Sequence, residues 1–304
     1  MDWIRLTRPF TLLPPLLGML SGAAAALGAG RSLVSGDRLL SNVLLGSLMA
    51  VLLNAASNVL NQVCDLELDR HNRPERPLPS GRIAPRAAFR FSLLLYLGAI
   101  LLAFLVQPAG RPELGVIVVF TAFLTWAYSS PPLRLRRSWW LAPLVIAVPR
   151  GGLLKVAGWA CLASVSSDLE PWLLALMFFL FILGAAPTKD FQDMEGDGRA
   201  GCSSLPLRFG PARAAWIMAP FYVVPWLLLI VFSRWAPGGK PLLTVDPLAA
   251  AWIGGILIVH GVLAAAFLIH ATETKSRPGR GAWRNLYILM MEAQVGLAAL
   301  YLCF

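Results

Sequence analysis

Two groups of acidic and amide side chains stand at the ends of apolar segments, at spacings that place each group on one face of a helix. They are Asn58, Asn61, Asp65 and Asp69, and then Asp190, Asp193 and Asp197. Residues three, four and seven positions apart share a helix face, so each group directs its oxygens to one side. Like charges at this spacing repel, and the cost rises beside a membrane. Two such faces looking at each other would form a binuclear site for a hard divalent cation and a diphosphate.

A short basic segment follows the first group. Three prolines and a glycine come soon after Asp69, and because proline cannot continue a helix we expect a stiff, irregular lid there. This lid carries Arg70, Arg73 and Arg76. Arginine binds phosphate through bidentate, charge-assisted hydrogen bonds. The lid therefore favours a phosphate-containing ligand beside the carboxylates.

The second group repeats the same combination of residue types. Lys189 adjoins Asp190, Arg199 follows Asp197, and glycines interrupt the segment. Carboxylates and basic side chains without histidine or thiolate ligands indicate magnesium-bridged phosphate rather than zinc. The recurrence suggests a loose internal repeat of two halves.

The composition identifies an integral membrane protein. The chain is 57% hydrophobic and 14% charged. Windows of roughly 20 residues predict an all-α polytopic protein, with one domain over 1–304 and about nine transmembrane helices. The candidate spans are 10–30, 39–62, 89–107, 114–130, 139–162, 171–189, 212–234, 247–271 and 284–304. Span 139–162 is interrupted by Pro149, Arg150, Gly151, Gly152 and Lys155.

The net charge of +10 is distributed as in a membrane protein rather than a nucleic-acid-binding protein. Nineteen of the 26 basic residues flank the spans on one side, and five lie on the other. The positive-inside rule then predicts a cytoplasmic N-terminus, an outside C-terminus and both acidic groups facing the cytoplasm. The first apolar run is long and is followed by another span, so we expect no cleaved signal peptide.

Cysteine and histidine give no sign of a zinc or disulfide site. The four cysteines are Cys64, Cys161, Cys202 and Cys303, and the three histidines are His71, His260 and His270. None of them has metal-ligand spacing, so we interpret the cysteines as packing residues.

With these motifs the chain resembles the UbiA superfamily of intramembrane prenyltransferases over nearly its whole length. Its first motif, NDxxDxxxD, aligns with Asn61, Gln62, Asp65 and Asp69, and RPLPSG follows from Arg76 to Gly81. The second, KDxxDxxGDxxxG, aligns with Lys189, Asp190, Asp193, Gly196, Asp197 and Gly201. YSSPPLRLRR, from Tyr128 to Arg137, is similar to a third family segment. Gln62 replaces an aspartate found in many members, which removes one possible outer metal ligand.

The resemblance implies a central cavity capped by cytoplasmic loops, in which Mg²⁺ ions bind the diphosphate of a prenyl diphosphate donor. It implies catalytic roles for Asp65, Asp69, Asp190 and Asp197, and further metal ligands in Asn61 and Asp193. Candidate substrate-binding residues are Asn58, Arg70, Arg76, Tyr128, Arg134, Arg150, Lys155 and Lys189. The prenyl group would pass to a lipophilic or aromatic acceptor within the membrane lipid.

Two other functions use similar residues. An ion-coupled transporter would hold its acids near the bilayer midplane, whereas these acids lie at helix ends beside arginines. A CDP-alcohol phosphotransferase also uses helical aspartates, but its DGxxAR pattern is out of register with Asp197–Gly198–Arg199–Ala200. The acceptor stays open among an aromatic acid, a quinone precursor, a tetrapyrrole alcohol and a glycerol phosphate ether, and so does the length of the prenyl chain.

Overall fold

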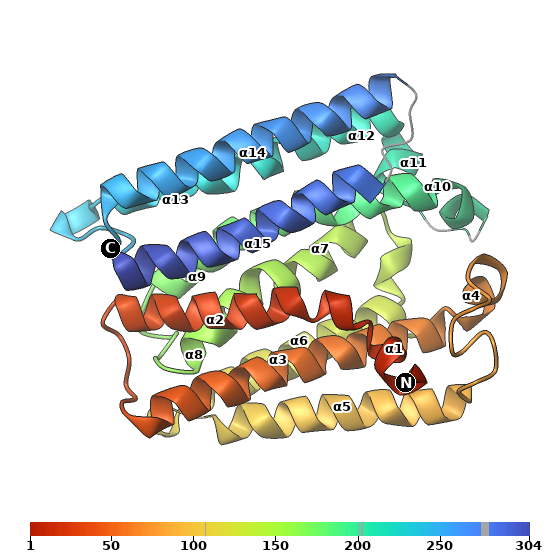
Figure 1. Ribbon diagram of the computed structural model, residues 1–304, viewed down its shortest axis with the longest axis horizontal. Helices are drawn as coiled ribbons and strands as arrows, with labels where there is room; N and C mark the ends of the chain where they lie inside the picture. The colour runs from red at the N-terminus through yellow and green to blue at the C-terminus, as the bar shows by residue number, and fades with distance from the viewer. Residues whose placement is uncertain (107, 200, 202, 275–279) are drawn as a thin grey trace.

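Long helices run side by side through the molecule, and short helices gather at one of its ends (Figure 1). This computed structural model describes residues 1–304 except 107, 200, 202 and 275–279, and excludes the side chains of 71, 72, 109, 195, 197, 199 and 280. The described residues contain helices and no strand, so the predicted all-α class is confirmed.

Seven helical segments among the described residues are long and apolar enough to cross a membrane. Four are single helices: α3 (Asp37–Cys64), α5 (Pro85–Leu105), α14 (Pro247–Glu273) and α15 (Arg280–Cys303). The other three, Leu141–Ala160, Glu170–Met194 and Pro211–Arg234, consist of consecutive shorter helices. These are α7 (Leu141–Ala147), η4 (Val148–Leu153) and α8 (Leu154–Ala160); α9 (Glu170–Ala185), η5 (Ala186–Lys189) and α10 (Asp190–Arg199); and α12 (Pro211–Met218), η6 (Ala219–Tyr222) and α13 (Val224–Arg234).

The two remaining predicted spans are helical but differ from single long helices. The first is a pair bent by 51°, in which α1 (Asp2–Thr7) and η1 (Pro9–Thr11) precede α2 (Leu13–Gly28). The other is α6 (Glu113–Ser129), whose 17 residues are at the lower end of the length range for a bilayer crossing. The predicted count of nine is therefore approximate.

The interrupted span 139–162 remains one helical segment because its irregular residues form a π-helix. This is η4, which contains Pro149, Arg150, Gly151 and Gly152. Proline removes a backbone donor from the helix, and single π-turns inside helices absorb such irregularities, often at functional sites.

Two glycines allow α2 and α8 to approach closely. A Cβ on Gly22 would lie 2.6 Å from the carbonyl oxygen of Lys155, and a Cβ on Gly158 would lie 2.5 Å from the carbonyl oxygen of Met19. Small residues at such crossings are a common way of packing helices within membranes. The contact brings Lys155 against α2.

The two termini lie at opposite ends of the bundle. The N-terminus shares its end with α1, α4 (Leu66–Asn72), α10 and α11 (Leu205–Phe209), and the C-terminus lies at the other end (Figure 1). Both acidic groups therefore lie at the N-terminal end, as predicted. The remaining short helices are η2 (Pro108–Gly110), η3 (Leu135–Arg137) and η7 (Pro237–Gly239).

We predict that this end faces the cytoplasm, because most basic residues flank the spans here. In a variant without other cysteines, Ser80→Cys should react with a membrane-impermeant maleimide only from the cytoplasmic side. The exposed native Cys303, retained alone, should react only from the outside. Labelling of position 80 from the outside alone would reverse the orientation.

Candidate active site

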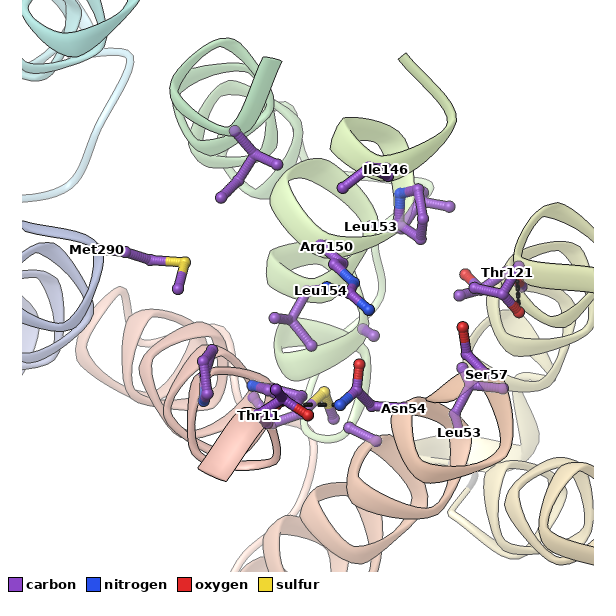
Figure 2. Close-up of a pocket in the computed structure, with 18 of the residues that line it drawn as sticks. Thr11, Leu53, Asn54, Ser57, Thr121, Ile146, Arg150, Leu153, Leu154 and Met290 are labelled. Carbon is purple, nitrogen blue, oxygen red and sulfur yellow. Dashed lines mark hydrogen bonds between the residues drawn. The ribbon is translucent and has the colours of Figure 1, made fainter. Parts of the chain in front are cut away.

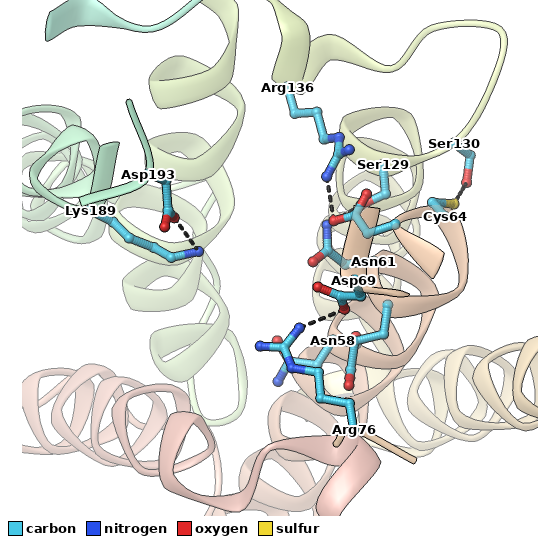
Figure 3. Close-up of polar contacts among 12 residues, drawn as sticks. Asn58, Asn61, Cys64, Asp69, Arg76, Ser129, Ser130, Arg136, Lys189 and Asp193 are labelled. Carbon is cyan, nitrogen blue, oxygen red and sulfur yellow. Dashed lines mark hydrogen bonds and ion pairs between the residues drawn. The ribbon is translucent and has the colours of Figure 1, made fainter. Parts of the chain in front are cut away.

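A cavity of about 1110 Å³ lies at the end of the bundle that carries the short helices. Its wall combines residues of α3, the α4 lid, α6, α7, η4 and the η5–α10 junction. Both predicted acidic groups contribute to it: Asn58, Asn61 and Asp65 from one side, and Asp190 and Asp193 from the other. Figure 3 shows Lys189 and Asp193 on a different helix from the first group and facing it. The sequence motifs, far apart along the chain, are thus brought to one cavity.

Two amides of α3, those of Asn58 and Gln62, hold the N-terminal segment in place. The Asn58 side chain donates to the Thr7 carbonyl at 3.0 Å and to the Thr11 hydroxyl at 2.8 Å. Gln62 is buried and donates to the Leu6 carbonyl at 2.7 Å. Asn61 donates to the Ser129 hydroxyl at 3.4 Å, across to α6. The donors of Asn58 and Gln62 thus fix α1 and η1 against α3.

The two carboxylates of the first group are paired with arginines. Asp69 is buried, and one of its oxygens accepts from Arg76 at 2.6 Å (Figure 3). One oxygen of Asp65 accepts from Arg136, while the other, Oδ1, is buried without a hydrogen-bond partner. Burial raises the pKa of the Asp65 carboxyl, and the Arg136 guanidinium opposes this rise.

The second acidic group is more open. Lys189 lies 3.4 Å from a carboxylate oxygen of Asp193, one helical turn further on. Asp190, which lies between Lys189 and Asp193 in the sequence, also lines the cavity. Asp197 belongs to α10, but its side chain lies outside the described part of the structure. Its role as a metal ligand remains a prediction.

Positive charge dominates the cavity wall. Among the described residues, nine basic side chains line it against four acidic ones. The basic residues are Arg5, Arg8, Arg73, Arg76, Arg82, Arg136, Arg150, Lys189 and Arg284. A concave surface with this excess attracts and retains anions.

Three predicted substrate-binding residues do not line this cavity. Arg70 is exposed and pairs with Glu67 at 2.7 Å. Arg134 has a left-handed backbone with φ of 40°, and its Nε is buried without a partner. Lys155 is buried among α2, α8 and α15. The positions of these three side chains do not support the predicted substrate contacts, which remain predictions.

Five arginines of the wall were not predicted as site residues: Arg5, Arg8, Arg82, Arg136 and Arg284. Arg136 lies two residues beyond Arg134, so the motif containing both already indicated a basic residue there. Arg8 precedes Pro9 and has φ of 54°, a conformation that is uncommon outside glycine and often accompanies functional sites. No sequence signal of Arg8 distinguishes it from an ordinary charge flanking a span.

A second, apolar chamber of about 200 Å³ adjoins the polar cavity. Ser57, Thr125, Arg150 and Trp283 belong to both walls, so the two spaces meet there. Arg150 projects from η4 into this junction (Figure 2), and Tyr128 lines the polar cavity nearby. Away from the junction the chamber is lined mainly by aliphatic side chains such as Leu53, Leu153 and Leu154. A charged headgroup and an apolar tail would each find a matching environment.

The donor set of the polar cavity fits Mg²⁺. Carboxylate and amide oxygens are the ligands that this hard cation prefers, and Asn61, Asp65, Asp190 and Asp193 offer them. The unpartnered Oδ1 of Asp65 is a buried oxygen still available to a cation. No three His, Cys, Asp or Glu side chains of the described residues form a ready-made metal group. Arg136 instead pairs with Asp65, and Lys189 with Asp193.

A model of the UbiA prenyltransferase family matches residues 11–291. The chain belongs to the UbiA prenyltransferase family. It is therefore an integral membrane enzyme of the prenyltransferase class, which sets aside the transporter and phosphotransferase alternatives.

Named relatives of this UbiA-family chain carry out two kinds of synthesis. The bacteriochlorophyll synthase 33 kDa chain of Cereibacter sphaeroides is 30% identical over 294 residues, which cover 89% of this chain and 93% of that protein. The digeranylgeranylglyceryl phosphate synthase of Thermococcus kodakarensis is 32% identical over 223 residues, which cover 73% of this chain and 74% of that protein. Both are relatives of this UbiA-family enzyme.

The fold is that of solved UbiA proteins. A UbiA homologue from Archaeoglobus fulgidus bound to DMAPP and Mg²⁺ matches all of this chain with a TM-score of 0.75 at 18% identity. A digeranylgeranylglyceryl phosphate synthase structure matches with a TM-score of 0.70 at 22% identity. The central cavity predicted from the resemblance is thus part of a UbiA-like fold.

Proposed function

We propose that this enzyme transfers a prenyl group from a prenyl diphosphate to a lipophilic acceptor inside the membrane, with Mg²⁺ at the two acidic faces. The observation that carries the proposal is the junction of a strongly basic polar cavity with an apolar chamber. A prenyl diphosphate is a ligand with this division, since its doubly phosphorylated head is polar and its tail is hydrocarbon.

The diphosphate would bind between the two acidic faces. Arg136, Arg76 and Lys189 line the cavity and each contacts a carboxylate, so each is positioned to exchange that carboxylate for a phosphate oxygen. Asn61, Asp65, Asp190 and Asp193 would hold Mg²⁺, with Asp69 and Asp197 as further predicted ligands. When bound, Mg²⁺ neutralises charge on the departing diphosphate.

The reacting carbon would lie at the junction of the two spaces. The allylic carbon–oxygen bond breaks, and its electron pair leaves with the diphosphate. The basic side chains stabilise that charge, and Arg150, which lines both cavities, would lie beside the reacting carbon. The carbon then bonds to the acceptor, which loses a proton to solvent or to the diphosphate. The apolar chamber excludes water, which would otherwise capture the prenyl cation.

The names of the relatives indicate two acceptor classes, a tetrapyrrole and a glyceryl phosphate. The experiment is to incubate purified protein in lipid nanodiscs with labelled geranyl, farnesyl or geranylgeranyl diphosphate, Mg²⁺ and a panel containing both classes, an aromatic acid and a quinone precursor. We expect one prenylated product and one diphosphate released per transfer. Diphosphate release without any prenylated acceptor would refute transfer. If neither diphosphate nor a prenylated acceptor is formed, the function as a whole is refuted.

The basic wall makes a separate prediction about donor affinity. Arg136→Ala, Arg76→Ala and Lys189→Ala should each raise the donor KM by about ten- to a hundredfold, because each loses a charge-assisted contact worth about 1.5–3 kcal/mol. Arg70→Ala is the matched control, since Arg70 lies on the same lid but pairs with Glu67 outside the cavity. Equal KM values in all four variants would contradict this assignment.

A further inference from the structure

The apolar chamber ends at a polar cluster that the transfer reaction does not use. The cluster consists of Ser21 on α2, Lys155 on α8 and Gln294 on α15, which are 1%, 1% and 2% exposed. Burial of three polar side chains within the spans is costly unless each finds a partner. Of the three, only Gln294 lines the chamber.

Lys155 is surrounded by acceptors. Its Nζ donates to the carbonyl oxygen of Gly18 at 3.4 Å, to the hydroxyl of Ser21 and to Oε1 of Gln294. It also lies 4.1 Å from the centre of the Phe178 ring. None of these partners is a carboxylate. The close approach of α2 and α8 at Gly22 and Gly158 supports this arrangement.

These contacts fix the orientation of the Gln294 amide. The amide atom that faces Lys155 is the oxygen, which accepts from Nζ. The Ser21 hydroxyl donates to the same oxygen at 2.7 Å. Both hydrogen bonds of the Gln294 side chain among the described residues involve Oε1, and the residue lines the chamber, so the amide nitrogen is available to the chamber.

Gln294 lies at the end of the chamber farthest from the polar cavity. On α15, Trp283 borders both spaces and Gln294 is the last lining residue, so at 1.5 Å per residue they are separated by about 16 Å. On α3 the lining likewise runs from Ser57, which borders both spaces, to Met49. The chamber of about 200 Å³ is a little larger than an engineered cavity of about 150 Å³ that binds benzene. It holds only a short part of a prenyl chain.

We propose that Gln294 is a specificity-determining residue that forms the floor of the tail chamber and limits the length of the prenyl chain, with Lys155 and Ser21 as positioning residues. The inference rests on the proposed function. A chain that reaches the floor presses hydrocarbon against an N–H group that has no partner, which is unfavourable. A shorter chain ends before it and leaves room for a water molecule on the amide.

The test compares kcat/KM for geranyl, farnesyl and geranylgeranyl diphosphates. The double variant Lys155→Met/Gln294→Met removes both buried polar groups, a replacement that is often tolerated when the shapes are similar. We expect the ratio of kcat/KM for geranylgeranyl over geranyl diphosphate to rise about tenfold, the effect of removing one unpaired buried donor. Val295→Leu, next to Gln294 on the exposed face of α15 and outside the walls of both cavities, is the control and should leave the ratio unchanged.

The single variant Gln294→Met retains the contact between Lys155 and Ser21 and should give the same shift if the double variant does not fold. A lower melting temperature with an unchanged ratio would mean that the cluster only fastens the helices, and would overturn the inference while the proposed function stands. A wild-type enzyme that transfers no prenyl group from any of the three donors would overturn both.

Discussion

Asp65→Asn and Asp190→Asn should each lower kcat by about a hundredfold or more while the protein still folds. The substitution keeps the shape of the side chain and removes one negative charge from opposite walls of the cavity. At Asp65 it also removes the buried oxygen that has no protein partner. If these carboxylates hold Mg²⁺ against the diphosphate, each variant binds the cation less well. Charge on the leaving group is then no longer neutralised during bond cleavage. The measurement is single-turnover release of labelled diphosphate at saturating donor and Mg²⁺.

Glu67→Gln is the matched control for this prediction. Glu67 lies two residues from both Asp65 and Asp69, but it is exposed and contacts Arg70 outside the cavity. Its replacement should leave kcat within about twofold, as expected for an exposed ion pair. Comparable losses in the Glu67 and Asp65 variants would indicate a general effect of lid charge rather than metal binding.

The fold was predictable from the sequence where apolar length alone decides the structure. Four spans are single helices close to the predicted ranges, because an apolar run of about 20 residues has little alternative in a bilayer. The bend of 51° before α2 was not predicted. It depends on contacts such as that of Asn58 with Thr7, which join segments far apart in the sequence.

The acidic side chains of the site were easier to predict than its basic ones. Helical spacing brought Asn58, Asn61 and Asp65 to one wall, as expected for residues three and four apart. Arginines in loops follow no such period. Arg134 has a left-handed backbone and does not line the cavity, and Arg136 reaches Asp65 instead. That choice depends on tertiary packing, which the spacing of residues does not encode.

The most direct test of the account is whether donor binding requires the divalent cation. Binding of a non-cleavable thiodiphosphate analogue of the donor should be measured by calorimetry in nanodiscs, with Mg²⁺ and then with excess EDTA. We expect the affinity to fall by about a hundredfold or more in EDTA and to return when Mg²⁺ is restored, while transfer stops and resumes in parallel. Asp190→Asn should bind the analogue weakly under both conditions. Unchanged affinity and full transfer in EDTA would contradict the account, because the two acidic faces would then have no cation to share.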